Sequence, residues 1–208
     1  MTFSMSLETF LAFVVAMSLL SLTPGPGFLA VVARSLGGGL MSGFATILGL
    51  ILGDILFLIL AIVGLSALAA AMGEFFLVVK ILGAGYLIWL GIMTWRARIS
   101  PPPAGVAMHK ADFHRSFALG FVVTLGNPKT ILFYSALVPT FIDMAALTLG
   151  DVALLSLVVA LVSLVVLGAY AFLATRAGRS IKSPRAFRWL NRATGGLLVG
   201  AGVAVATR

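Results

Sequence analysis

Cysteine is absent from the 208 residues of this chain, and charged residues make up only 10% of it. Without cysteine the chain can form neither disulfides nor thiolate metal sites, and it has no thiol nucleophile. Soluble domains carry roughly 25% charged residues, whereas 61% of this chain is hydrophobic. A soluble fold could not bury that much apolar surface, so the composition predicts a membrane protein.

Acidic residues and histidines are also few, with six and two in the whole chain. His109 and His114 fall in one polar segment, and Asp54 is the acid placed deep in an apolar run. A metal transporter needs several ligands that converge on the ion, and an intramembrane enzyme needs a nucleophile with its base or a metal site. The sequence shows neither pattern, so we expect no enzyme activity, no metal site and no cofactor.

The net charge of +8 does not indicate nucleic-acid binding, because the basic residues are divided among short segments between apolar runs. Positive residues in that position mark the cytoplasmic side of a membrane protein. The basic segment from Arg176 to Arg192 is expected to fix the topology and to contact anionic lipid headgroups.

Six apolar runs predict an all-α polytopic membrane protein with six transmembrane helices. A helix of about 20 residues crosses a hydrocarbon core of roughly 30 Å. The first run is interpreted as a retained span rather than a signal peptide, because no Lys or Arg precedes it and no cleavage pattern follows. The predicted spans are 7–34, 40–63, 75–95, 117–139, 152–174 and 187–206.

A Pro-rich linker at 100–114 separates two halves, 1–99 and 115–208, with three predicted spans each. Three consecutive prolines predict an extended, non-helical linker. Eleven of the 14 Lys and Arg residues lie on the side of this linker, which assigns that side to the cytoplasm and both termini to the opposite side. Since each half has an odd number of spans, the halves enter the membrane in opposite directions. This arrangement predicts two inverted three-helix repeats.

The first and fourth spans share an interruption near mid-membrane, where Pro26 can be aligned with Pro128. Proline lacks an N–H and cannot continue a regular helix. Open backbone at that depth is tolerated only when it is buried in protein or lines a watery cavity, and the half-helix that follows can receive a carboxylate. The alternative is a pair of kinks that only shape packing. The predicted substrate-binding residues are Pro24, Gly25, Pro26, Gly126, Asn127, Pro128 and Lys129.

Two charges lie within the apolar spans, Asp54 in the second and Lys129 behind the second break. A charge at the bilayer centre costs about 2.5–3.5 kcal/mol on the insertion scale, so such residues are usually paired or functional. A carboxyl group that moves between apolar surroundings and a nearby lysine would take up and release a proton. Asp54 is therefore the predicted proton-coupling residue, and the alternative is a static ion pair. The small residues Gly49 and Gly53 predict close helix packing.

The Pro24-Gly-Pro26 segment, Gly53-Asp54, the third span from Lys80 to Gly91 and Gly126-Asn-Pro-Lys129 together resemble the LysE/RhtB family of amino-acid exporters. The resemblance implies a multi-pass secondary exporter of the bacterial cytoplasmic (inner) membrane that moves amino acids or close derivatives by proton antiport. It is also compatible with a homodimer. Since Asp54 is the one clear intramembrane acid, neutral amino acids are the expected substrates. The alternative function is efflux of metal or other small ions.

Overall fold

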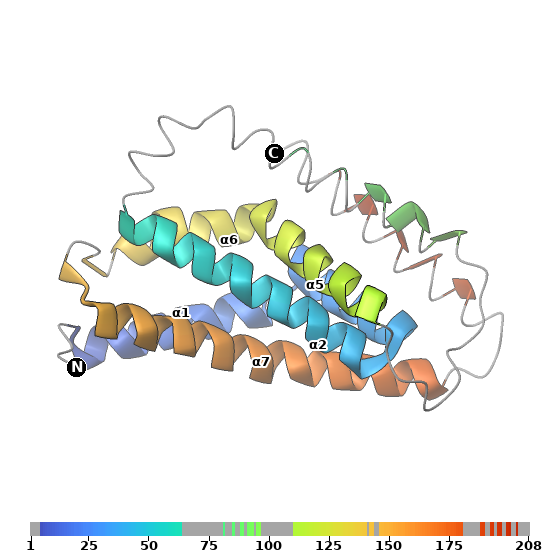
Figure 1. Ribbon diagram of the computed structural model, residues 1–208, viewed down its shortest axis with the longest axis horizontal. Coiled ribbons are helices and arrows are strands. Elements are labelled where there is room, and N and C mark those ends of the chain that lie inside the picture. The colour runs from blue at the N-terminus through green and yellow to red at the C-terminus, as the bar shows by residue number, and fades with distance from the viewer. Residues whose placement is uncertain are drawn as a thin grey trace.

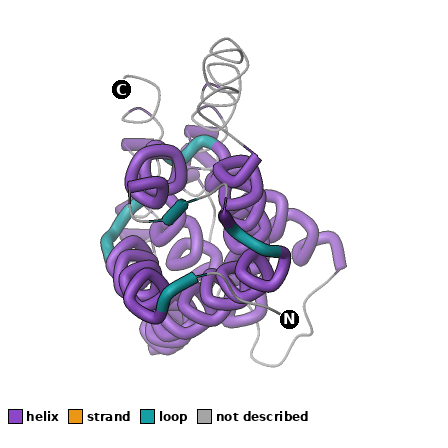
Figure 2. Tube along the Cα trace, turned by 90° about the vertical axis from the view of Figure 1, so that its left-hand side faces the viewer, coloured by secondary structure: helices purple, strands orange, loops and turns teal. Residues whose placement is uncertain are grey.

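The computed structural model describes residues 5–63, 110–140, 142–143 and 146–180, with scattered residues between 81 and 96 and between 188 and 203. All regular structure in these residues is helical, and the long helices run side by side as a bundle (Figures 1 and 2). The predicted spans 75–95 and 187–206 lie largely outside the described residues, and so does the linker at 100–109. The described residues therefore allow a comparison with the other four predicted spans, 7–34, 40–63, 117–139 and 152–174.

The first predicted span is a broken helix that continues into a hairpin. Helix α1 (Leu7–Leu22) ends at the break formed by residues 23–25, and α2 (Pro26–Val63) follows. The chain reverses within α2 at Gly39, where the backbone leaves helical geometry (Figure 1). Gly27 faces Leu50 and Gly43 faces Ser35 across this reversal, so 26–38 and 40–63 pack as antiparallel helices. The connection predicted between 34 and 40 thus shrinks to a single glycine.

Gly39 has φ 76° and ψ −177°, a conformation that is essentially restricted to glycine. We expect Gly39→Ala to lower the free energy of unfolding by about 1–3 kcal/mol, because the strain falls on the backbone itself. Gly37→Ala is the matched control, since a Cβ at either glycine meets nothing within 4 Å and Gly37 has no positive φ. The measurement is the melting temperature of each purified variant in detergent. Equal melting temperatures for the two variants would contradict the assignment of a strained turn.

The fourth predicted span is also broken. Helix α5 (Lys110–Leu125) is followed by α6 (Pro128–Leu132), by a π-helical turn η1 (Phe133–Leu137) and by a 3₁₀ turn η2 (Val138–Thr140). The segments on either side of the break are bent by 56°.

The start of α5 corrects one prediction, because residues 110–114 were expected in the extended linker and are helical instead. The prolines end at 103 and place no restriction on a helix that begins seven residues later. Asp112 lies in the first turn of α5, where the helix dipole favours an acid. Phe113 also stacks on Phe117, one turn further on, with ring centroids 6.5 Å apart.

Helix α7 (Leu149–Ser180) extends beyond the predicted span 152–174 at both ends. Its N-terminus is held by a reciprocal capping box. Asp151 Oδ2 accepts a hydrogen bond from the Thr148 N–H at 2.9 Å, and Thr148 Oγ1 accepts one from the Asp151 N–H at 3.2 Å. The other oxygen of Asp151 accepts a bond from the Met5 N–H at 3.4 Å. The cap therefore also joins the beginning of the described chain to α7.

The outer surface of the bundle is apolar. On α1 the exposed large side chains recur about once per turn, and they are Leu7, Leu11, Val15, Leu19 and Leu22. Helices α2 and α7 each contain an apolar stretch long enough to cross a bilayer, and the bent α5–α6 pair forms a third candidate. A surface of this kind is stable in lipid rather than in water.

Helices α2 and α5 pack with their backbones in contact. A Cβ added to Gly49 would collide with the carbonyl of Phe117, and a Cβ added to Gly120 would collide with that of Thr46. A Cβ at Gly53 would lie 2.7 Å from the side chain of Thr124. The predicted packing role of Gly49 and Gly53 is confirmed.

The described core consists of two apolar clusters along the bundle. The first cluster contains Ala30, Val31, Ile47, Leu50, Ile51, Leu119, Val123, Leu167 and Ala171. The second cluster contains Phe13, Met17, Phe57, Leu58, Ala61, Phe133, Tyr134, Val138, Ile142, Leu155, Val158 and Val159. On α2 and α7 the chain passes from one cluster to the other through a polar residue, Asp54 and Ser163 respectively. The two clusters are thus separated by a polar layer.

Candidate substrate site

The break after α1 exposes backbone carbonyls because of its prolines. In a regular helix the carbonyl of Leu20 would accept a hydrogen bond from the N–H of residue 24, but Pro24 has none. The Thr23 N–H still closes the last turn on Leu19 at 3.0 Å, and the Gly25 carbonyl already accepts the first bond of α2, from Leu29 at 3.0 Å. The Leu20 carbonyl therefore needs a donor from outside α1.

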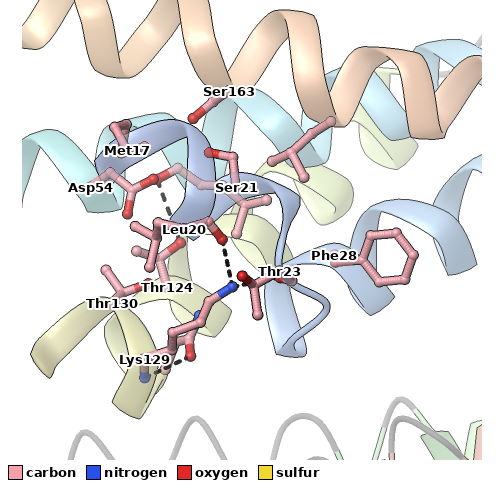
Figure 3. A pocket seen from close by; sticks show the side chains of 14 residues that line it. Met17, Leu20, Ser21, Thr23, Phe28, Asp54, Thr124, Lys129, Thr130 and Ser163 are labelled. Carbon is pink, nitrogen blue, oxygen red and sulfur yellow. Dashed lines mark hydrogen bonds between the residues drawn. The ribbon is translucent and has the colours of Figure 1, made fainter. Parts of the chain in front are cut away.

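Lys129 supplies that donor. Its Nζ donates to the Leu20 carbonyl at 2.7 Å and to the Thr23 carbonyl at 2.7 Å (Figure 3). Carbonyls at a helix C-terminus carry the negative end of the helix dipole, so an ammonium is stabilised there. No ion pair joins Lys129 to Asp54 in the described part of the chain, where the ammonium binds the end of α1 instead.

The break before α6 is closed by its own residues. The Asn127 side chain accepts a hydrogen bond from the Lys129 N–H at 3.1 Å and caps α6, with Pro128 in its first turn. The Asn127 N–H donates to the Thr124 carbonyl at 3.0 Å, in place of the N–H that Pro128 lacks. The two breaks therefore differ in how their backbone groups are satisfied. The carbonyls at the first break accept hydrogen bonds from Lys129, which belongs to the second break, whereas the second break uses its own Asn127.

A cavity lies where the two breaks meet α2 and α7 (Figure 3). Its volume is about 40 Å³, which leaves room for roughly three water molecules. Its lining residues are Met17, Leu20, Ser21, Thr23, Gly27, Phe28, Leu50, Asp54, Thr124, Asn127, Lys129, Thr130, Ser163 and Leu167. The cavity occupies the polar layer between the two apolar clusters.

Asp54 and Ser163 are two polar side chains of this cavity that have no hydrogen-bond partner among the described residues. The Asp54 side chain is 7% exposed, and its carboxylate has neither a hydrogen bond nor an ion pair there. The Ser163 hydroxyl, on a side chain that is 1% exposed, also lacks a hydrogen bond within the described chain. A buried polar group without a partner costs roughly 1–3 kcal/mol. Both groups are therefore available to a polar ligand.

The predicted site residues divide into two sets. Asp54, Asn127 and Lys129 line the cavity. The remaining predicted residues form the backbone of the breaks beside it, and they are Pro24, Gly25, Pro26, Gly126 and Pro128. Gly25 lies close to the lysine, because a Cβ added to it would be 3.4 Å from Lys129 Nζ.

Ser163 was not predicted from the sequence as a site residue, although a polar residue within an apolar helix is a general signal of such a role. Hydroxyl residues in apolar helices usually bond to their own backbone one turn earlier, as Ser18, Thr46 and Thr175 do here at 2.7–2.9 Å. Ser163 makes no such bond. It lies close to the middle of α7, where it contributes to the polar layer.

Tyr134 was also missed. Its ring is fully buried, stacks on Phe57, and directs its hydroxyl to the sulfur of Met17 at 3.8 Å. Methionine sulfur is a weak acceptor. Tyr134 belongs to the second apolar cluster and reaches the cavity through Met17, which is one of the lining residues.

Helices with apolar outer faces and a polar cavity at two broken spans define the class of membrane transport proteins. The LysE type translocator family matches residues 18–208, and the chain belongs to this family.

Several relatives are similar along most of the chain. The homoserine/homoserine lactone efflux protein of Salmonella typhimurium is 37% identical over 199 residues, which cover 95% of this chain and 96% of that protein. An uncharacterized membrane protein of Synechocystis is 37% identical over 191 residues, 90% of each chain. The leucine efflux protein of Salmonella choleraesuis is 33% identical over 125 residues, which cover 60% of this chain and 59% of that protein. No solved structure matches the chain.

Proposed function

We propose that this protein exports neutral amino acids or close derivatives across the bacterial cytoplasmic membrane, and that the proton motive force drives the export. The observation that carries the proposal is the cavity that contains both the unpartnered Asp54 carboxylate and the Lys129 ammonium, which binds the carbonyls at the end of α1. An amino acid presents one ammonium and one carboxylate. The cavity offers groups of both opposite charges within one small volume.

The membership of the translocator family and the names of two relatives, which refer to homoserine and leucine efflux, support amino acids as the class of substrate. A strongly cationic substrate would require further acids, and Asp54 is the acid among the cavity residues. Metal-ion efflux has less support, because no group of three or more potential ligands comes together among the described residues.

Proton coupling is assigned to Asp54, the acid in this cavity. Its carboxyl group lies between the two apolar clusters and close enough to Lys129 for their charges to interact. Export requires this cavity to open to each side of the membrane in turn, which requires the helices around it to move. Such a movement changes the surroundings of Asp54 and can thereby load or release a proton.

The wider topology remains the one that the sequence predicts, with a linker shortened by the start of α5. In this proposal six spans form two inverted three-helix repeats, and both termini lie outside the cytoplasm. The broken α1–α2 and α5–α6 segments are then the corresponding first spans of the two repeats. Discontinuous helices that meet at the midplane are the usual substrate site of transporters built in this way.

The direct test is efflux from cells loaded with labelled amino acids, including homoserine, leucine, a basic and an acidic amino acid. We expect cells that express the protein to lose one neutral class faster than vector controls, and we expect an uncoupler to remove the difference. Equal efflux from both cell types for every amino acid would overturn the proposal. Faster efflux that persists with the uncoupler would retain export and overturn proton coupling.

A further inference from the structure

The contact between Lys129 and the end of α1 has the chemistry of a binding site for an ammonium group. Two carbonyl oxygens, those of Leu20 and Thr23, lie 2.7 Å from one Nζ. Charged hydrogen bonds of this length are among the stronger ones in proteins. The acceptors belong to the backbone, and the proline at position 24 keeps one of them free of its helical partner.

The donor, in contrast, belongs to a side chain that can move. Lys129 is partly buried, and its ammonium is carried on a flexible four-carbon stem. The same cavity holds an acid, Asp54, that this ammonium does not contact, and a hydroxyl, Ser163, that bonds to nothing in the described chain (Figure 3). The cavity thus contains more polar groups than Lys129 satisfies.

We propose that the Leu20 and Thr23 carbonyls bind the primary ammonium of the exported molecule and that Lys129 and the substrate occupy them in turn. The inference rests on the proposed function and adds a step to it. When the substrate ammonium takes the carbonyls, Lys129 is released toward the substrate carboxylate. When the substrate leaves, the lysine returns and satisfies the open helix end. Withdrawal of the lysine also enlarges the cavity, because Lys129 is one of its lining residues.

This exchange sets a chemical requirement on the ligand. The occupant of the carbonyl pair has to donate at least two N–H bonds, so primary ammonium groups qualify and quaternary ammonium groups do not. Charge alone is insufficient. Asp54 attracts any cation, whereas the carbonyl pair selects for hydrogen-bond donors.

The absence of cysteine from the chain allows a direct test. Lys129→Cys places a single thiol at this position in the full-length protein. Reaction with an aminoethyl thiosulfonate rebuilds a side chain of lysine-like length with a primary ammonium, and the trimethylammonium homologue rebuilds the same charge without N–H donors. We expect the reagent that carries the primary ammonium to raise the melting temperature of the variant by about 2–4 °C. The reagent that carries the trimethylammonium group is expected to leave the melting temperature unchanged.

A second measurement does not depend on the reaction of the thiol. Butylammonium, titrated into purified Lys129→Ala, is expected to raise its melting temperature in a saturable manner, and tetramethylammonium is not. Arg115→Ala, which removes an exposed cation and keeps Lys129, is the control and should respond to either compound no more strongly than the wild type does. Equal effects of the two amines, or of the two thiol reagents, would overturn the carbonyl site. These readouts require no transport, so they stand apart from the efflux test of the proposed function.

Exchange itself is tested in the wild-type protein, in which the lysine competes with added amine. We expect butylammonium to bind at least about tenfold more weakly to the wild type than to Lys129→Ala, since the tethered ammonium makes two charged hydrogen bonds. Equal affinity would show that the amine binds elsewhere and would contradict alternate occupancy.

Discussion

Replacement of Asp54 by Asn is expected to abolish uncoupler-sensitive export, with a loss of more than about 100-fold in the initial rate. The change removes a charge and a titratable proton from the cavity but keeps the volume of the side chain. If Asp54 carries the proton, the variant loses uphill export and still exchanges labelled for unlabelled substrate. If Asp54 instead binds the substrate ammonium, exchange is lost as well. Efflux and exchange assays in the same vesicles separate these two roles.

The control for this prediction is Glu8→Gln, because Glu8 is an exposed acid in the first turn of α1 and does not line the cavity. Its export rate should match that of the wild type. Uphill export by the Asp54 variant at the normal rate would remove Asp54 from the mechanism, whatever the result for Glu8.

Replacement of Pro24 by Ala is expected to reduce export by about tenfold or more, which reflects the loss of one or two hydrogen bonds to a charged group. Alanine restores an N–H that can continue α1 by bonding to the Leu20 carbonyl. That carbonyl would then be shared between the helix and Lys129. Pro24 is exposed, so its removal costs little packing. The measurement is the initial rate of efflux, normalised to the amount of protein in the membrane.

Pro26→Ala provides the comparison for Pro24→Ala. Pro26 is the first residue of α2, a position where a helix needs no N–H donor. Export by this variant should stay within about twofold of the wild type. A reversed order of the two effects would indicate that the shape of the break matters rather than the open carbonyl.

Much of the architecture follows from local rules that a sequence expresses directly. A proline inside an apolar run interrupts the regular helix before it, so the interruptions at 24 and 128 were predictable. A carboxylate in the middle of an apolar run has few stable environments other than a polar cavity, and Asp54 lies in one. Small residues one turn apart favour close helix contact, as Gly49 and Gly53 show.

The remaining features depend on the rotation of the helices and on contacts that are distant in the sequence. The hydrogen bond from Lys129 to the Leu20 carbonyl joins residues 109 positions apart. Neither a lysine nor a leucine at these positions indicates by its residue type that the two are in contact. Ser163 resembles the other hydroxyl residues of the spans until its orientation is known. The early start of α5 arises from its own first turn, which a run of prolines seven residues before it does not reveal.

The division of the core into two apolar clusters has a consequence for mutations far from the cavity. In a transporter that alternates between two conformations, each cluster is expected to be packed most tightly in one of them. A substitution that loosens the first cluster, such as Ile47→Ala, then changes the ratio of the two populations in one direction. Leu155→Ala, in the second cluster, changes it in the other. Random variants that alter the apparent affinity for substrate should therefore map to the two clusters with opposite signs.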